Sequence, residues 1–161
     1  MFDLINGLPV HPLVVHAVVV LLPLAALGTI AIAVRPGWRR TYGWLVVAAG
    51  VITIVLLPVA TSSGEALEER VGRPGEHAEM GDALIWFTLP MLLLVAALVW
   101  FDRRPSPKVD GRLLKALPAL AVVAALACSV QVYRVGDSGA RAAWAERVGS
   151  SSSASADSDG G

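Results

Sequence analysis

The chain carries three histidines, and each stands at or just ahead of the beginning of a long apolar segment. His11 and His16 open the first such segment, and His77 precedes the third. Imidazole nitrogens are common ligands for zinc, iron and haem. If the first and third segments cross a membrane in the same direction, their histidines lie at the same face of it. The sequence therefore predicts a histidine site at one end of a helical bundle.

The spacing at the first pair assigns different roles to the two rings. In His11-Pro12-Leu13-Val14-Val15-His16, proline suits the first helical position and His11 the cap. His16 follows about 140° around the helix and about 7.5 Å deeper. We expect His16 to point into the bundle as the buried ligand, with His11 as a second ligand or hydrogen-bond partner. His77 would supply an opposing nitrogen, and Met80, on the same helical face, a soft ligand.

Two metal chemistries could use these side chains. One is a haem b held between histidines of different helices, with His16 and His77 as axial ligands. The other is a divalent ion, because carboxylates crowd the same loop, Glu65 and Glu69 among them. The chain lacks H-E-x-x-H and C-x-x-C-H motifs, so neither chemistry is singled out. A third alternative is an accessory membrane protein whose histidines only cap helices and hold no cofactor.

The elements that must position these residues are four runs without Asp, Glu, Lys or Arg. Each is long enough to cross a bilayer as a helix, and 55% of the chain is hydrophobic. We predict an all-α integral membrane protein, a four-transmembrane-helix bundle over residues 1–148. The predicted spans are about 11–34, 42–62, 83–101 and 115–133, followed by a short interfacial helix 139–148, capped by Ser138, and a disordered tail 149–161.

The spans themselves exclude several functions. None has a charged residue at its centre, which argues against a proton pump, a channel with a charged filter or a voltage sensor. The first run has no basic flank and is too long for a signal-peptide core, so we expect it to be an uncleaved span. Each span carries one proline, at which we expect it to bend: Pro23, Pro58, Pro90 and Pro118.

The charges predict an orientation. The loops after the first and third spans hold eight of the thirteen basic residues and only two of the thirteen acids. By the positive-inside rule these loops are cytoplasmic, so both termini are extracytoplasmic. We expect a multi-pass protein of a bacterial inner (plasma) membrane, in contact with the lipid bilayer and with no nucleic-acid partner. Small residues on the spans also permit a homo-oligomer.

Four stretches of the chain resemble a known family. They are residues 6–16, 61–69, 77–81 and 136–144, and they contain a His-Pro-x-x-Val-His head and a Gly-Asp-Ser-Gly-Ala tail motif. They resemble a family of bacterial, actinobacterial-type, four-helix predicted membrane proteins of unknown function, over nearly the whole chain. Relatives often have histidine where this chain has Asp137, which leaves a ligand role for that position unsupported.

The resemblance implies a redox setting. Some members of the family are joined to Rieske-type iron-sulfur or cytochrome c domains, and His11, His16 and His77 match the family's histidines. From this analogy we expect a small haem-binding or electron-transfer subunit, a component rather than an enzyme on its own, with quinone or a redox protein as partner.

Overall fold

The computed structural model describes residues 4–5, 8–71, 76–104 and 110–156, with side chains for 11–66, 77–104, 110–112 and 114–141. Helices account for nearly all of the described chain. A short antiparallel pair of strands, β1 (Leu4–Ile5) and β2 (Leu8–Pro9), precedes them. The helices are α1 (Val10–Val34), α2 (Pro36–Val71), α3 (Glu76–Asp82), α4 (Leu84–Arg103) and α5 (Gly111–Ala156).

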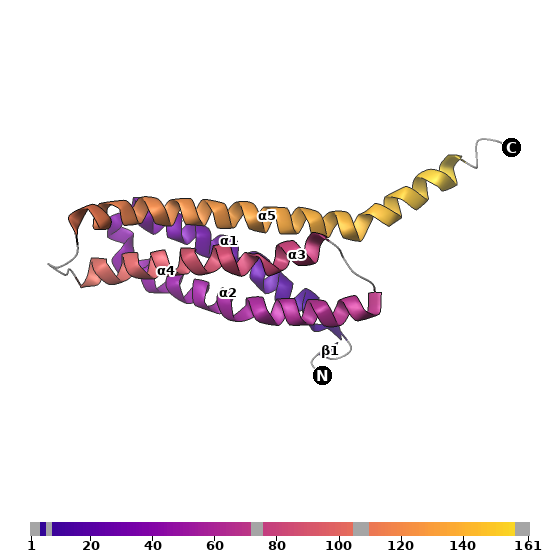
Figure 1. Ribbon diagram of the computed structural model, residues 1–161, viewed down its shortest axis with the longest axis horizontal. Coiled ribbons are helices and arrows are strands. Elements are labelled where there is room, and N and C mark those ends of the chain that lie inside the picture. The colour runs from indigo at the N-terminus through magenta and orange to yellow at the C-terminus, as the bar shows by residue number, and fades with distance from the viewer. Residues whose placement is uncertain (1–3, 6–7, 72–75, 105–109, 157–161) are drawn as a thin grey trace.

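The four long helices form an elongated bundle (Figure 1). α1 packs along α2 and α5, α4 packs along the same two helices, and α1 and α4 contact each other little. The order around the bundle is therefore α1, α2, α4, α5, with α1 diagonal to α4. Short α3 lies against α5 at the end where α1 begins and α2 passes Ser63. We call this the histidine end, and the opposite end, with Arg35, Arg39 and Arg103, the arginine end.

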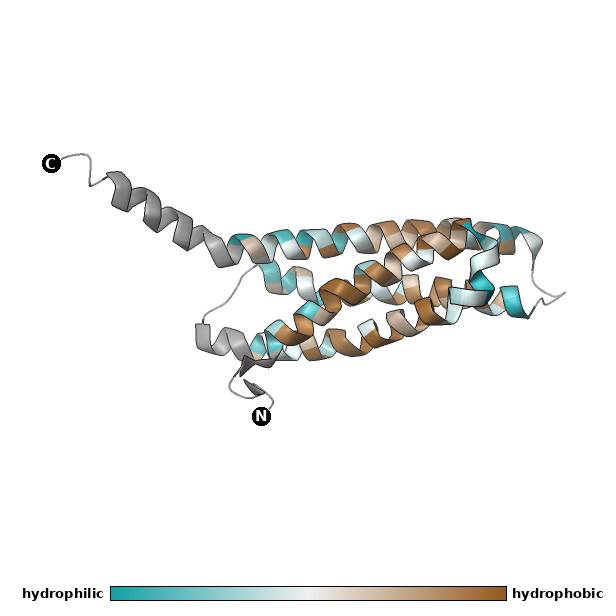
Figure 2. Ribbon diagram, turned by 180° about the vertical axis from the view of Figure 1, so that it is seen from behind, coloured by the Kyte–Doolittle hydropathy of each residue, from teal (hydrophilic) through white to brown (hydrophobic). Residues whose placement is uncertain are grey.

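The outside of the bundle is apolar. Large side chains such as Leu27, Leu45 and Trp86 are 62%, 69% and 74% exposed. In Figure 2 the hydrophobic colour covers the middle of the helices, and hydrophilic residues collect toward the two ends. Four helical stretches are long and apolar enough to span a membrane: His11–Val34, Pro36–Ala66, His77–Arg103 and Leu114–Arg141. Water would disfavour such a surface and lipid matches it, so this is a multi-pass membrane protein.

Glycines let the helices approach closely inside the bundle. A Cβ built on Gly28 of α1 would lie 2.8 Å from a methyl group of Val46 on α2. At Gly43, on α2, the corresponding distance to Val99 on α4 is 2.7 Å. Buried hydroxyls do not interrupt this packing, because each bonds its own helix; Thr29, for example, donates to Ala25 O at 2.8 Å. Small residues thus set the helix spacing, as in other membrane bundles.

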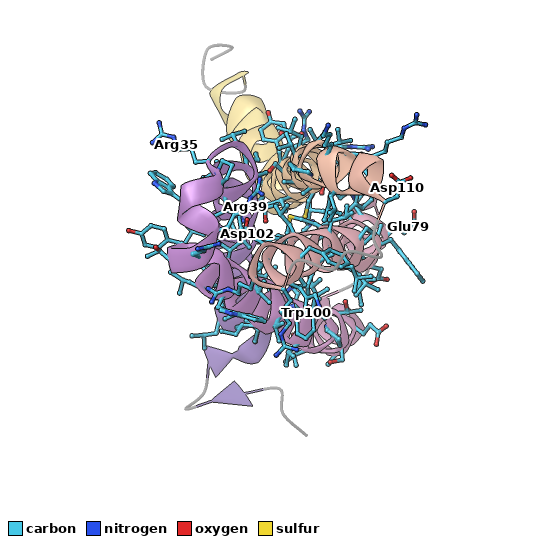
Figure 3. The ribbon with its side chains drawn as sticks, turned by 90° about the vertical axis from the view of Figure 1, so that its left-hand side faces the viewer. Arg35, Arg39, Glu79, Trp100, Asp102 and Asp110 are labelled. Carbon is cyan, nitrogen blue, oxygen red and sulfur yellow. The ribbon has the colours of Figure 1, made fainter. Side chains whose placement is uncertain are left out.

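Ionic contacts close the arginine end. The Arg39 side chain donates from Nε to Ile32 O and from Nη2 to Ala33 O, both at 2.8 Å. Its Nη1 lies 3.6 Å from Asp102 Oδ1 at the end of α4, and the two labelled side chains are neighbours in Figure 3. Carbonyls in the last turn of a helix lack intrahelical donors. Arg39 therefore satisfies the end of α1 and joins it to α4.

The structure confirms the all-α fold with four membrane-spanning helices, and each contains the proline noted in the sequence. It differs at the last span, because α5 is one helix from Gly111 to Ala156. The separate helix at 139–148 is absent from this stretch, and the predicted tail is helical as far as Ala156; residues 157–161 lie outside the described chain. Ser138 does not cap a helix but donates to Val135 O at 2.9 Å within α5.

Candidate functional site

His11, in the first turn of α1, is held by the facing turn of α2. Its Nδ1 lies 3.0 Å from Ala60 O and 3.2 Å from Ser63 Oγ. The Ser63 hydroxyl itself donates to Ala60 O at 3.0 Å. One carbonyl therefore accepts from both side chains, and the half-buried imidazole joins the start of α1 to α2.

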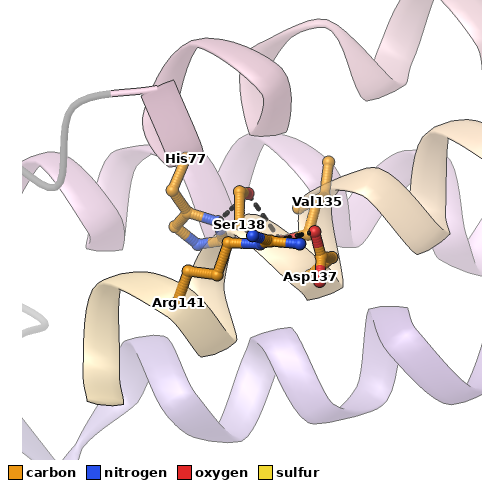
Figure 4. Close-up of polar contacts among 5 residues, drawn as sticks. All are labelled: His77, Val135, Asp137, Ser138 and Arg141. Carbon is orange, nitrogen blue, oxygen red and sulfur yellow. Dashed lines mark hydrogen bonds and ion pairs between the residues drawn. The ribbon is translucent and has the colours of Figure 1, made fainter. Parts of the chain in front are cut away.

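His77, in α3, is held by α5 in the same way. Its Nδ1 lies 3.1 Å from Val135 O and 3.2 Å from Ser138 Oγ. Figure 4 shows the imidazole, the serine and this carbonyl together, with the Asp137–Arg141 pair close by. The arrangement repeats that at His11 atom for atom: a carbonyl, the serine three residues later, and an imidazole from another helix.

A glycine follows the serine in both places and makes room for the ring. A Cβ on Gly64 would lie 3.0 Å from His11 Cε1, and a Cβ on Gly139 would lie 2.9 Å from His77 Cε1. Real Cβ atoms rarely come so close to other heavy atoms, so any larger residue would push the imidazole away. Both rings can therefore rest against the helix backbone only because these positions are glycine.

These contacts define the chemistry that each ring offers. A backbone carbonyl can only accept, so Nδ1 must carry the proton that it donates. In the neutral imidazole this leaves Nε2 with a free lone pair. Histidines that bind metals usually have this arrangement, with the second ring nitrogen donating to a carbonyl or carboxylate. His11 and His77 each combine a fixed ring with a nitrogen that can bind a ligand.

The expectation that His16 points into the bundle is wrong. Its side chain is exposed, and its Nδ1 bonds Pro12 O of its own helix. The buried side of α1 begins at Val18, two residues and therefore about 200° away around the helix. His16 thus lies on the outer side of α1, away from the packed interior. His11, expected nearer the water, is the more enclosed of the two.

The other predicted ligands lie in α2 and α3. Met80 lies in α3, and its carbonyl accepts from buried Gln131 Nε2 of α5 at 3.1 Å. Glu65 is exposed and borders a hollow formed by α2, the end of α3 and the start of α4, and no histidine is among the residues that line it. The Glu69 side chain lies outside the described ones. Among the described side chains, no three His, Cys, Asp or Glu residues form a group that could hold a metal ion.

The sequence reasoning missed the partners of the histidines. Ser63, Gly64 and Gly139 were not singled out as site residues, and Ser138 was expected to cap a helix. The Ser-Gly pair occurs at 63–64 and again at 138–139, and this recurrence was the available signal. Asp137, in the tail motif, accepts from Arg141 Nε at 2.9 Å across one turn of α5.

Comparison with known proteins places this architecture in a family. No curated protein and no solved structure matches the chain. The model of the family described as "Predicted membrane protein (DUF2231)" matches residues 7–152, which include both histidine contacts and all four spans. This confirms the resemblance found in the sequence, and the chain belongs to the DUF2231 family of predicted membrane proteins.

Proposed function

We propose that the protein is a membrane-embedded haem-binding subunit, in which His11 and His77 would hold a b-type haem at the histidine end. The observation that supports this proposal is the hydrogen bonding of both rings. In each, Nδ1 is committed to a carbonyl, so that the neutral ring keeps its lone pair on Nε2. This pairing replaces the predicted pair of His16 and His77, because His16 lies on the exposed side of α1.

The donor set favours haem over a bare ion. A protein-bound zinc ion usually needs three or four protein ligands, whereas a haem iron already has four porphyrin nitrogens and needs only one or two ligands from the protein. Each fixed histidine stands without two further His, Cys, Asp or Glu partners among the described side chains. A divalent-metal site at Glu65 and Glu69 stays a prediction.

The residues of this chain would hold and insulate the cofactor. Ser63 and Ser138 would fix the rotation of the two imidazoles, and the apolar helices would exclude water. A bound haem supplies one-electron chemistry, with a potential set by its ligands and surroundings. A quinone or a partner redox protein would be the other half of the couple.

A second candidate function rests on the same contacts. Each imidazole joins two helices, His11 joining α1 to α2 and His77 joining α3 to α5. In an accessory membrane protein without a cofactor, these bonds would serve only to hold the rim of the bundle together. The two functions differ in whether Nε2 ever binds a ligand.

Absorption spectroscopy distinguishes them. The full-length protein, expressed with haem precursor and purified in mild detergent, is expected to show a Soret band at one haem per chain. His11→Ala and His77→Ala should each abolish the native band, and His16→Ala, the matched control, should retain it. A colourless wild-type protein, or bands that survive in both of the first two variants, would rule out this haem site and leave the accessory role.

We also propose that the histidine end is extracytoplasmic, since the basic loops gather at the opposite end. The chain has one cysteine, Cys128, which is buried. A membrane-impermeant thiol reagent added to intact cells should therefore label Ser62→Cys and not Arg104→Cys, both at exposed positions. Labelling of Arg104→Cys alone would show that the histidine end is cytoplasmic and that the proposed orientation is wrong.

A further inference from the structure

The first and third long helices share one pattern of burial. His77 lies 66 positions after His11 (77 minus 11). Subtracting 66 from the number of any buried residue of α4 gives the number of a buried residue of α1. The two helices therefore turn the same positions, counted from their histidines, toward the interior of the bundle. The pairs are Val18 and Leu84, Leu22 and Thr88, Ala25 and Met91, Thr29 and Val95, Ile32 and Leu98, and Ala33 and Val99.

The second and fourth long helices also match. Ser138 lies 75 positions after Ser63 (138 minus 63), and the same shift relates the carbonyls of Ala60 and Val135 and the glycines Gly64 and Gly139. It also relates buried residues further along the two helices. These pairs are Val46 and Ala121, Gly50 and Ala125, and Thr53 and Cys128.

The packing order agrees with this correspondence. Exchanging α1 with α4 and α2 with α5 exchanges diagonal helices and leaves every neighbour relation in the bundle unchanged. α1 and α4 both run from the histidine end to the arginine end, as Figure 1 shows. The two halves are therefore related by an approximate two-fold axis along the bundle, as in membrane proteins built from parallel repeats.

The halves differ in length at the arginine end. The difference in residue number between matched positions is 66 as far as Val99 and 75 from Ala121 onward. The stretch between these two residues contains the connection between α4 and α5. In the first half, Arg35 is the single residue between α1 and α2. Additional residues at this connection lengthen the second hairpin without disturbing the histidine end.

We infer that the chain consists of two copies of one helical hairpin, each with one copy of the same imidazole site. A copy consists of a histidine, the carbonyl that accepts from its Nδ1, the serine three residues later, and the glycine beside the ring. In the neutral ring its Nε2 keeps a lone pair, and the ligand class that such a nitrogen would take is a transition metal. Only the identity of that ligand, haem iron, rests on the proposed function. Ser63 and Ser138 are equivalent positioning residues that fix the rings.

Nitrogen NMR of the haem-free, full-length protein in micelles tests the equivalence. With ¹⁵N-labelled histidine the protein gives signals from three rings, and protonated and bare nitrogens are well separated. At a pH at which the rings are neutral, His11 and His77 should both show a protonated Nδ1 and a bare Nε2. Ser63→Ala should shift the His11 signals and leave those of His77, and Ser138→Ala should do the reverse.

Two internal controls sharpen this test. Ser62→Ala removes the neighbouring hydroxyl, which bonds Val59 O and makes no hydrogen bond to a histidine among the described residues, so it should shift neither ring. His16, bonded to its own helix, should stay constant in all variants. Opposite tautomers at His11 and His77, or a response to only one of the two serine variants, would overturn the equivalence. Matched tautomers in a protein that never binds haem would uphold it and reject the proposed function alone.

Discussion

The two ends of the bundle are held together by different chemistry. At the arginine end, the Arg39 guanidinium uses all three nitrogens on two carbonyls and a carboxylate. At the histidine end, each imidazole uses one nitrogen and leaves the other without a described partner in the contacts that fix the ring. The Arg39 contacts therefore hold α1, α2 and α4 together and leave no guanidinium nitrogen without a partner. The histidine contacts hold the helices and still offer two nitrogens, which is why we place the function there.

Arg39→Ala should have the largest effect on stability, and it best distinguishes the structural role of the arginine end from the role of the histidine end. It removes the donors of two carbonyls and one of the two arginine partners of Asp102, the other being Arg40, and the Arg39 side chain is only 13% exposed. We expect a loss of about 2–3 kcal/mol in the free energy of unfolding, because buried polar groups would be left unpaired. Thermal melting in detergent, followed by circular dichroism, measures it.

Arg35→Ala is the matched control at this end, because Arg35 is exposed and lies over the Trp38 ring at 4.8 Å. Its melting temperature should stay near that of the wild type. If Arg39→Ala melts at the same temperature as Arg35→Ala, the Arg39 contacts do not stabilise the bundle. The histidine NMR signals should be unchanged in both variants.

Gly64→Ala and Gly139→Ala should destabilise the histidine end, and to similar extents. The added methyl would overlap the imidazole in either copy, so we expect about 1–3 kcal/mol for each. Gly136→Ala is the control in α5, because a Cβ there meets nothing within 4 Å. A large effect at one glycine and none at the other would break the equivalence of the two sites.

Gln131→Met should have a moderate effect and tests how α3 is held. The variant keeps the length of the side chain and removes the bond to Met80 O, which lies in the same short helix as His77. We expect a loss of about 1 kcal/mol. The His77 NMR signals should broaden while those of His11 stay sharp. Equal changes at both rings would mean that α3 is not positioned by this bond.

Asp137→Ala should have the smallest effect. The carboxylate pairs with Arg141 one turn along α5, where both side chains are exposed at 42% and 78%, so the pair is screened by water. Neither the melting temperature nor the haem spectrum should change measurably. Loss of the Soret band in this variant would show that Asp137 belongs to the site after all.

Much of the fold could be predicted because its signals are local. Charge-free runs located the four spans, and the histidines marked one end. The continuity of α5 through Gly136 and Gly139 was missed, since both residues usually weaken a helix in isolation. Lipid-facing and core-facing residues are equally apolar in α1, so the sequence gives no stripe that fixes the rotation of the helix. His16 was therefore placed on the wrong side.

The partners of the histidines depend on contacts between distant segments. The pairing of His11 with Ser63 and of His77 with Ser138 spans 52 and 61 residues, and it depends on the relative heights of two helices. Spacing within one helix carries no such information. The internal repeat is visible in the sequence as the recurring histidine and Ser-Gly pair, but these residues alone do not show which atoms meet.

The most direct test of the account is electron paramagnetic resonance of the oxidised, haem-loaded protein. Two imidazole ligands, one from each half, predict a single low-spin ferric signal of the bis-histidine type. His11→Ala and His77→Ala should each convert whatever haem remains to the high-spin form, and His16→Ala should keep the low-spin signal. Absence of any haem iron signal, or a low-spin signal that survives in both single variants, would contradict the assignment of the two rings as ligands.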